Sequence, residues 1–131
     1  MFYKTIALSN SIINEVEAGA LSNKEFILAE AKFMRAWCYF ELTTLWGDVP
    51  LRLENPSEIS PDAFAKAKST RAEIYTQIEY DLAAAVAGLP VKGATKQPFR
   101  VSKGTAQAVL GKVLVFQGKY KEAITHLEQV I

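Results

Sequence analysis

The sequence has one cysteine and one histidine, Cys38 and His126, among its 131 residues. A single thiol cannot close a disulfide within the chain, and it cannot build a zinc site from cysteines. A single histidine likewise excludes a histidine-rich metal site. We therefore expect no cofactor and no metal-binding residue, and we interpret Cys38 as a small buried apolar side chain.

An excess of charge and long apolar runs are also absent. Lys and Arg number 15 and Asp and Glu number 14, so the net charge is +1, whereas a dedicated nucleic-acid binder needs a basic surface. No stretch approaches the roughly 18 apolar residues of a membrane-spanning helix. The first residues lack the basic start and clean apolar run of a signal peptide. If the native protein is exported, we expect this chain to be a processed or truncated piece of it.

Proline is missing from both ends of the chain, since all 5 prolines lie between residues 50 and 98. Proline disrupts helix interiors because it lacks the N–H and clashes with the preceding turn. Apolar residues recur at helical spacing outside this middle region. We predict one all-α domain over 1–131, with long loops inserted between antiparallel helices at roughly 2–18, 23–46, 71–87, 103–117 and 119–131.

Polar residues at three of the expected helix starts support these bounds. Ser22 with Glu25, and Thr70 with Glu73, fit the capping box, in which two side chains satisfy unpaired backbone N–H groups. Ser102 is expected to cap the fourth helix and is not interpreted as a nucleophile. The sequence therefore predicts two capping boxes and one simple N-cap.

Aromatic residues recur at helical spacing along the second predicted helix. Phe26, Phe33, Trp37 and Phe40 form one stripe, which favours core packing over ligand contact. Trp46 lies at the end of this helix. Two roles are open to its ring, namely packing against the core or a loop, and stacking on a ligand. We favour packing there as well.

Charged residues near apolar segments are interpreted as structural. Arg35 lies on a helix that is apolar nearly all round, and an unpaired buried guanidinium would be costly. We predict a carboxylate partner for it, with Asp81 as the first choice. Asp48 and Glu30 are expected to form ion pairs or to anchor loops. A loose basic cluster is expected to remain solvated, and it consists of Lys92, Lys96, Arg100 and Lys103.

No set of residues indicates catalysis. His126 has no partner motif, and Gly104 lacks the Gly-rich frame of a phosphate loop. No nucleophile, metal-ligand or phosphate-binding constellation accompanies them. We therefore expect a protein that is not an enzyme, with no catalytic residue, and the sequence identifies no ligand-binding residue.

The last two predicted helices fit the tetratricopeptide pattern, in which antiparallel helices pack through small residues at fixed offsets. The positions that match are Leu110, Gly111, Leu114, Gly118, Tyr120, Ala123, Leu127 and Val130. Gly111 and Ala123 are expected where the helices approach closely, and Tyr120 is expected to seal the pair.

The final helix is expected to leave an apolar surface uncovered. Tyr120, Ala123 and Val130 are assigned to packing on the fourth helix, whereas Ile124, Leu127 and Ile131 recur at one-turn spacing on another side. We expect an exposed apolar patch there, covered by later residues of a longer chain or by a second copy through self-association.

Four blocks in order resemble the SusD/RagB family of outer-membrane nutrient-binding lipoproteins of Bacteroidetes-type bacteria. They cover about residues 25–131 and consist of 29–40 (AEAKFMRAWCYF), 46–51 (WGDVPL), the spaced set Tyr75, Ile78, Asp81, Leu82, Ala84, Ala85, Leu89 and Pro90, and 100–106 (RVSKGTA).

The resemblance implies a tetratricopeptide-like scaffold in a non-catalytic protein at the outer-membrane surface. Such a protein captures oligosaccharides, or sometimes peptides, for a TonB-dependent transporter of the SusC type. The sequence departs from the family in extent and in lacking the signal peptide and the lipobox cysteine, which Cys38 cannot replace because it lies in mid-helix. The alternative is a generic tetratricopeptide scaffold for protein interactions, although ordinary adaptor repeats lack such long loops.

Overall fold

The computed structural model describes residues 1–57, 60–94 and 97–131. Its helices are α1 (Phe2–Ala18), α2 (Lys24–Trp46), the single-turn α3 (Pro61–Phe64), α4 (Arg71–Gly88), α5 (Lys103–Phe116) and α6 (Tyr120–Glu128). Within these described ranges there is no β-strand, only an isolated antiparallel bridge between Val49 and Ser69. The predicted all-α fold is confirmed.

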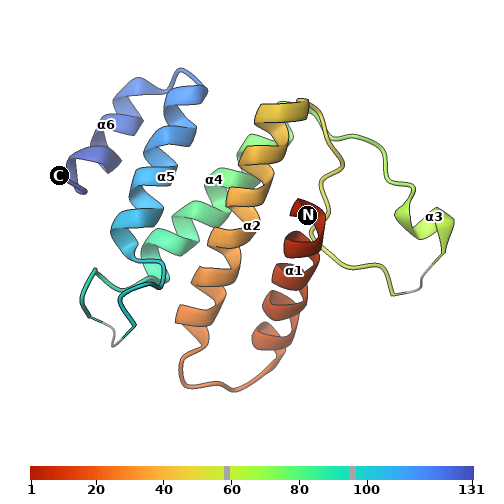
Figure 1. The fold of residues 1–131 in the computed structure, drawn as a ribbon, viewed down its shortest axis with the longest axis horizontal. Helices are drawn as coiled ribbons and strands as arrows, with labels where there is room; N and C mark the ends of the chain where they lie inside the picture. Colours follow the sequence, from red (N-terminus) through yellow and green to blue (C-terminus); the bar gives the residue numbers. More distant parts are fainter. Residues whose placement is uncertain (58–59, 95–96) are drawn as a thin grey trace.

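The long helices pack as a series of antiparallel neighbours, each on the next in the chain (Figure 1). α1 packs on α2, α2 on α4, α4 on α5, and α5 on α6. This nearest-neighbour arrangement is typical of tetratricopeptide-like helical arrays. The core residues that are least exposed come from α1, α2, α4 and α5, and include Ile6, Ala36, Tyr39, Phe40, Ile74, Ile78, Leu82, Ala106 and Val113.

Two of the three predicted caps are confirmed. Thr70 and Glu73 form the full capping box at the start of α4, and the Ser102 hydroxyl accepts a hydrogen bond from the Thr105 N–H at the start of α5. The Ser22–Glu25 box is wrong. α2 begins at Lys24 with Asn23 as its N-cap, because a turn closed by the Lys24 N–H on the Leu21 carbonyl takes up residue 22.

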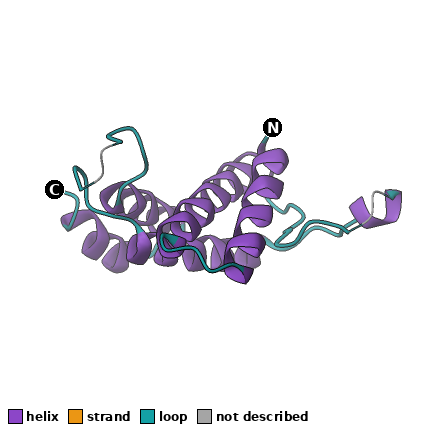
Figure 2. Cartoon of the chain, turned by 90° about the horizontal axis from the view of Figure 1, so that it is seen from below, coloured by secondary structure: helices purple, strands orange, loops and turns teal. Residues whose placement is uncertain are grey.

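The long segment between α2 and α4 leaves the helical body and returns to it. At its base, the Ser69 N–H donates to the Val49 carbonyl at 3.0 Å, and the Asp48 carboxylate accepts from the Arg71 N–H at 2.8 Å. Gly47 ends α2 with φ of 74°, a left-handed conformation that glycine adopts without strain. Figure 2 shows the resulting narrow arm, with α3 at its tip, standing apart from the helices.

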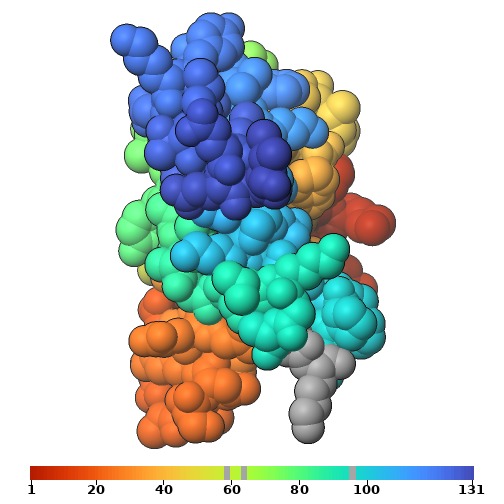
Figure 3. Space-filling model, turned by 90° about the vertical axis from the view of Figure 1, so that its left-hand side faces the viewer, coloured from red at the N-terminus to blue at the C-terminus, as the bar shows by residue number. Residues whose placement is uncertain are grey.

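The α6 end of the molecule differs in part from the expectation. Ala123 is buried as predicted, but Tyr120 and Val130 are exposed, contrary to the prediction that they pack on α5 as buried residues. The physical reason is that Tyr120 is the first residue of α6, and that α6 ends at Glu128, which leaves Val130 beyond the helix. The expected exposure of Ile124 and Ile131 is confirmed. Leu127, expected on the same uncovered side, is instead half-buried and packs against α5 at Gly111, because it faces the close contact between the two helices. Figure 3 looks onto this end, with α6 in dark blue.

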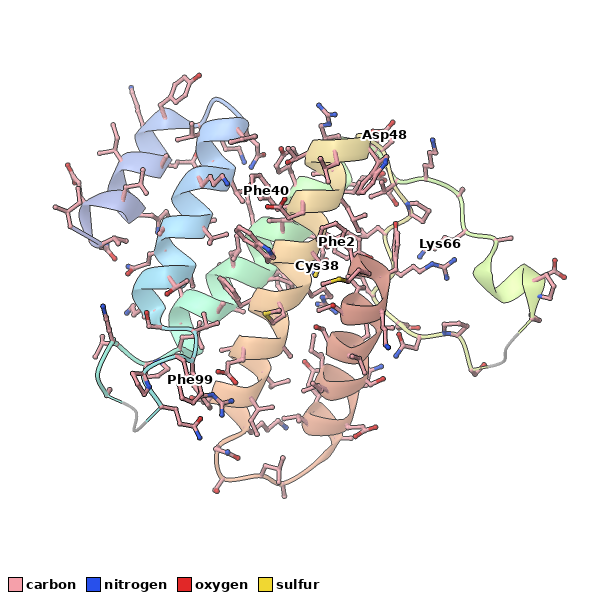
Figure 4. All side chains as sticks on the ribbon, in the orientation of Figure 1. Phe2, Cys38, Phe40, Asp48, Lys66 and Phe99 are labelled. Carbon is pink, nitrogen blue, oxygen red and sulfur yellow. The ribbon has the colours of Figure 1, made fainter. Side chains whose placement is uncertain are left out.

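Trp46 is more exposed than predicted, at 62% of its surface. Its ring makes an edge-to-face contact with Phe2, with centroids 6.4 Å apart and planes at 71°. The helix position explains this, because the last turn of α2 extends past the first residues of α1 (Figure 4). The interpretation of Phe33 and Phe40 as core residues is confirmed, whereas Phe26 and Trp37 are half-buried at the margin of the core.

Candidate ligand-binding site

A buried polar centre lies where α1, α2 and α4 meet. The Arg35 guanidinium donates from Nε and Nη2 to the two Asp81 carboxylate oxygens, each at 2.8 Å. Arg35 is 5% exposed and Asp81 is fully buried. The remaining guanidinium nitrogen, Nη1, donates to Asn10 Oδ1 at 2.9 Å, and Gln77 also donates to Asp81 at 3.1 Å. The predicted Arg35–Asp81 pair is confirmed, and its bidentate geometry joins two helices.

The same polar centre positions the segment that follows α2. The Asn10 amide donates to the Arg52 carbonyl at 3.2 Å, while its oxygen receives the Arg35 hydrogen bond. The Tyr39 hydroxyl donates to that carbonyl at 2.9 Å and accepts from the Arg52 N–H at 2.6 Å. The backbone at residue 52 is therefore fixed by side chains from both α1 and α2.

Three further hydrogen bonds tie this segment to α1. The Tyr3 hydroxyl donates to the Pro50 carbonyl at 2.8 Å. The Asn55 amide donates to the Ala7 carbonyl and to the Ser11 hydroxyl, each at 2.8 Å. These bonds hold residues 50–56 alongside α1 and leave a space between them.

That space, the α1–loop pocket, has a volume of about 350 Å³, within the roughly 300–1,000 Å³ typical of small-molecule sites. It combines an apolar wall with amide, guanidinium and carboxylate groups, and its lining residues are Tyr3, Ile6, Ala7, Asn10, Pro50, Arg52, Glu54, Asn55 and Pro56. Such a mixture matches a hydroxyl-rich ligand, because each hydroxyl both donates and accepts hydrogen bonds.

Burial shapes the ionisation of the tyrosines at the pocket. Tyr39 lies beneath it, and desolvation raises the pKa of its phenol to about 12, although its hydrogen bond with the Arg52 backbone opposes the shift. Burial also raises the pKa of Tyr3, against the opposing charge of Arg52. Both phenols are therefore neutral hydrogen-bonding groups at physiological pH.

A second hollow, of about 580 Å³, lies between the start of α5 and the residues that follow α6. Its described lining residues include no aromatic ring and no carboxylate, and they are Val91, Lys92, Ser102, Lys103, Gly104, Thr105, Gln107, Ala108, Gln129 and Val130. The α1–loop pocket is the smaller of these two, but it presents a wider range of groups to a ligand, because its lining includes an aromatic ring, a guanidinium and a carboxylate.

The other described charged or titratable residues named in the sequence analysis lie outside the α1–loop pocket. Arg100 forms an ion pair with Glu30 and lies 4.8 Å from the Phe26 ring centroid, so it is not part of a solvated basic cluster. Lys96 falls outside the described residues. His126 lies on α6, and its Nδ1 atom is buried without a hydrogen-bond partner in the described part of the chain.

Metal binding and thiol chemistry find no support in the residues that are described. Across 1–57, 60–94 and 97–131, no three His, Cys, Asp or Glu side chains are grouped so that they could hold a metal ion. Cys38 is buried, and desolvation raises the pKa of its thiol, which disfavours the reactive thiolate. Among the same residues, no helix combines the length and apolar character that crossing a bilayer requires.

The pocket residues were not identified from the sequence. They come from two segments, 3–10 and 50–56, whose contact depends on the hydrogen bonds described above. The Pro50 and Pro56 spacing did indicate an irregular segment, but no local pattern in one sequence shows which helix that segment meets.

Comparison with known proteins shows the family of the chain. Residues 1–115 match the SusD-like family model described as starch-binding associating with outer membrane. A SusD-like protein P2 from Formosa agariphila is 32% identical over 136 residues, which covers 98% of this chain and 25% of that relative. The chain spans about a quarter of the length of the curated relatives it matches.

Solved structures agree with this match. A SusD-like carbohydrate binding protein from Bacteroides fragilis has a TM-score of 0.90 at 27% identity, covering 98% of this chain and 25% of that one. A laminarin binding SusD-like protein has a TM-score of 0.87 at 34% identity, covering 98% of this chain and 28% of that one. The chain therefore belongs to the SusD-like family, whose members associate with the outer membrane.

Proposed function

We propose that this chain forms the helical scaffold of a non-catalytic glycan-capture protein that serves a TonB-dependent transporter of the SusC type. The family match over residues 1–115 carries the proposal. The structures described as carbohydrate binding and laminarin binding support the ligand class, since they share this fold over 98% of the chain. We further propose that the protein is a surface-exposed lipoprotein and that residues 1–131 fold as one domain.

Within the chain, the α1–loop pocket is the proposed glycan contact. Its amide, guanidinium and carboxylate groups are complementary to sugar hydroxyls, and the Tyr3 ring and two prolines supply an apolar wall for the C–H faces of a sugar. The pocket is also preorganised, because six hydrogen bonds that involve the side chains of Tyr3, Asn10, Tyr39 and Asn55 fix residues 50–55. Preorganisation lowers the entropic cost of binding.

Calorimetric titration of the purified protein with laminarin oligosaccharides tests this proposal. We expect Arg52→Gln and Glu54→Gln each to weaken binding about tenfold, the effect of losing roughly 1.4 kcal/mol of contact. Glu15→Gln, an exposed change on α1 outside the pocket, is the matched control and should bind normally. Unchanged affinity in both pocket variants would place the glycan contact elsewhere.

The transporter and the lipoprotein character need a separate measurement. Crosslinking of the protein in intact cells, followed by mass spectrometry of the outer membrane, is expected to recover a TonB-dependent transporter. Metabolic labelling with a fatty acid should mark the same protein. Crosslinks to other proteins alone would favour the generic tetratricopeptide scaffold, which the α5–α6 hairpin also fits.

A further inference from the structure

Three aromatic rings form a cluster where α2 and α5 meet, away from the α1–loop pocket. Phe40 and Phe116 are in edge-to-face contact, with centroids 5.1 Å apart and planes at 78°. Trp37 lies 6.4 Å from Phe40 on the same side of α2. Phe40 is buried and forms the floor of the cluster, whereas Trp37 is half-buried and Phe116 is 53% exposed. Figure 4 shows Phe40 on the side of α2 that faces α5.

A lysine ammonium lies over this cluster. Lys112 is one turn before Phe116 on α5, and its Nζ is 5.3 Å from the Phe40 centroid, 5.7 Å from that of Trp37 and 5.9 Å from that of Phe116. All three distances are within the cation–π range of about 6 Å. The Lys112 ammonium and the partly exposed rings of Trp37 and Phe116 therefore share one solvent-accessible surface above the buried Phe40, which we call the aromatic–lysine platform.

This lysine differs from the other described cations that lie over aromatic rings. Lys32 is paired with Glu17, and Arg100 is paired with Glu30. Lys112 makes no ion pair with any described residue, and the acidic residue closest in sequence to Trp37, the half-buried Glu41, is not bound to it. The positive charge of the platform is thus available to a ligand.

An exposed aromatic surface beside an unpaired cation is complementary to a ligand with an apolar face and a negative charge. A sugar ring presents C–H groups on its face, and a uronic acid adds a carboxylate at its edge. The rings would stack on the C–H face, and the ammonium would donate a charge-assisted hydrogen bond to the carboxylate. A neutral glucan would use the rings but not the charge.

We propose that the aromatic–lysine platform is a subsite for acidic glycans, with Trp37 and Phe116 as stacking surfaces and Lys112 as the carboxylate contact. The inference rests on the proposed glycan-capture function and adds a ligand class and a second location to it. It gives the protein two glycan contacts, one on each side of α2.

Tryptophan fluorescence offers a direct test because the chain has only 2 tryptophans, Trp37 and Trp46. In a Trp46→Phe background, the emission reports on Trp37 alone. We expect a galacturonic acid trisaccharide to change this emission and to bind about tenfold more weakly to the Lys112→Gln variant. Lys121→Gln, an exposed lysine change on α6, is the matched control and should bind as the background does.

Two further measurements separate the inference from the function on which it rests. Phe116→Ala should weaken binding of the acidic trisaccharide while its circular dichroism and unfolding midpoint show a folded protein. Binding of laminaritriose at the α1–loop pocket should be unaffected by Lys112→Gln. If the acidic sugar fails to bind, or binds equally well to Lys112→Gln, the inference is overturned, and retained laminaritriose binding would leave the proposed function standing. Loss of both sugars would overturn both.

Discussion

Gly111 and Leu127 meet at the α5–α6 contact so closely that a side chain at residue 111 has no room. A Cβ added to Gly111 would lie 2.5 Å from Leu127 Cδ2 and 2.6 Å from its Cγ. Gly111 is in the middle of α5, where glycine is otherwise unfavourable. The close approach of the two helices therefore depends on this residue, as the tetratricopeptide pattern predicted.

Gly111→Ala is expected to destabilise the protein by about 1–3 kcal/mol, because the methyl group must displace a packed leucine. Urea denaturation at equilibrium measures the change. Gly104→Ala is the control within the same helix, since its Cβ would meet only the Ser102 hydroxyl at 3.9 Å, and it should be neutral or stabilising. A Gly111→Ala protein as stable as the parent would contradict the close contact.

Asp81→Asn is expected to destabilise the protein by about 3–5 kcal/mol, because it leaves the Arg35 guanidinium buried without its counter-charge. Equilibrium denaturation in guanidinium chloride measures the free energy of unfolding of this variant and of its control. Glu17→Gln breaks the partly exposed pair with Lys32, in which Nζ and Oε1 are 3.8 Å apart, and should cost less than about 1 kcal/mol. Equal effects of the two changes would show that the Arg35–Asp81 pair is not desolvated as described.

The sequence alone predicted the close helix approach at Gly111 and the Arg35–Asp81 pair for different physical reasons, whereas it placed Leu127 on the uncovered side of the last helix. Gly111 follows from a repeat with fixed offsets, and the Arg35–Asp81 pair follows from the cost of leaving a guanidinium unpaired in an apolar helix. Both inferences follow from the residue pattern and from elementary energetics. The N-caps at Thr70 and Ser102 were predictable because each side chain accepts a hydrogen bond from a backbone N–H only three residues later in the chain.

Features that depend on distant segments were not predictable in this way. The α1–loop pocket requires residues 50–56 to fold back onto α1, and the position of Lys112 over Trp37 requires α5 to pack beside α2. Tyr120 was misassigned because its repeat position implies packing, whereas the short α6 places it at an exposed helix start. These outcomes depend on tertiary geometry that local periodicity does not encode.

Stability is expected to fall at alkaline pH because of Tyr39. Its pKa is raised to about 12 in the folded protein, against an ordinary value of 10.0, so the folded state retains the proton when the unfolded state loses it. The resulting stabilisation is complete below about pH 10 and is lost as pH rises through about 12, and it amounts to roughly 2–3 kcal/mol. Urea denaturation at pH 9 and pH 11.5 should show the loss in the parent protein, and Tyr39→Phe should show a smaller loss between the same two pH values.

Thr70→Ala is expected to destabilise the protein by about 0.5–2 kcal/mol, because the Thr70 hydroxyl accepts from the Glu73 N–H at the start of α4 and closes the capping box. Ser22→Ala is the informative comparison. A hydroxyl residue followed three positions later by Glu is present at both sites, but α2 begins at Lys24 and residue 22 forms no cap. Removing the Ser22 hydroxyl should therefore change the unfolding midpoint very little. Thermal unfolding followed by circular dichroism distinguishes the two variants directly. Equal destabilisation by Ser22→Ala would mean that α2 starts one residue earlier than described, with Ser22 as the N-cap and Glu25 completing the box.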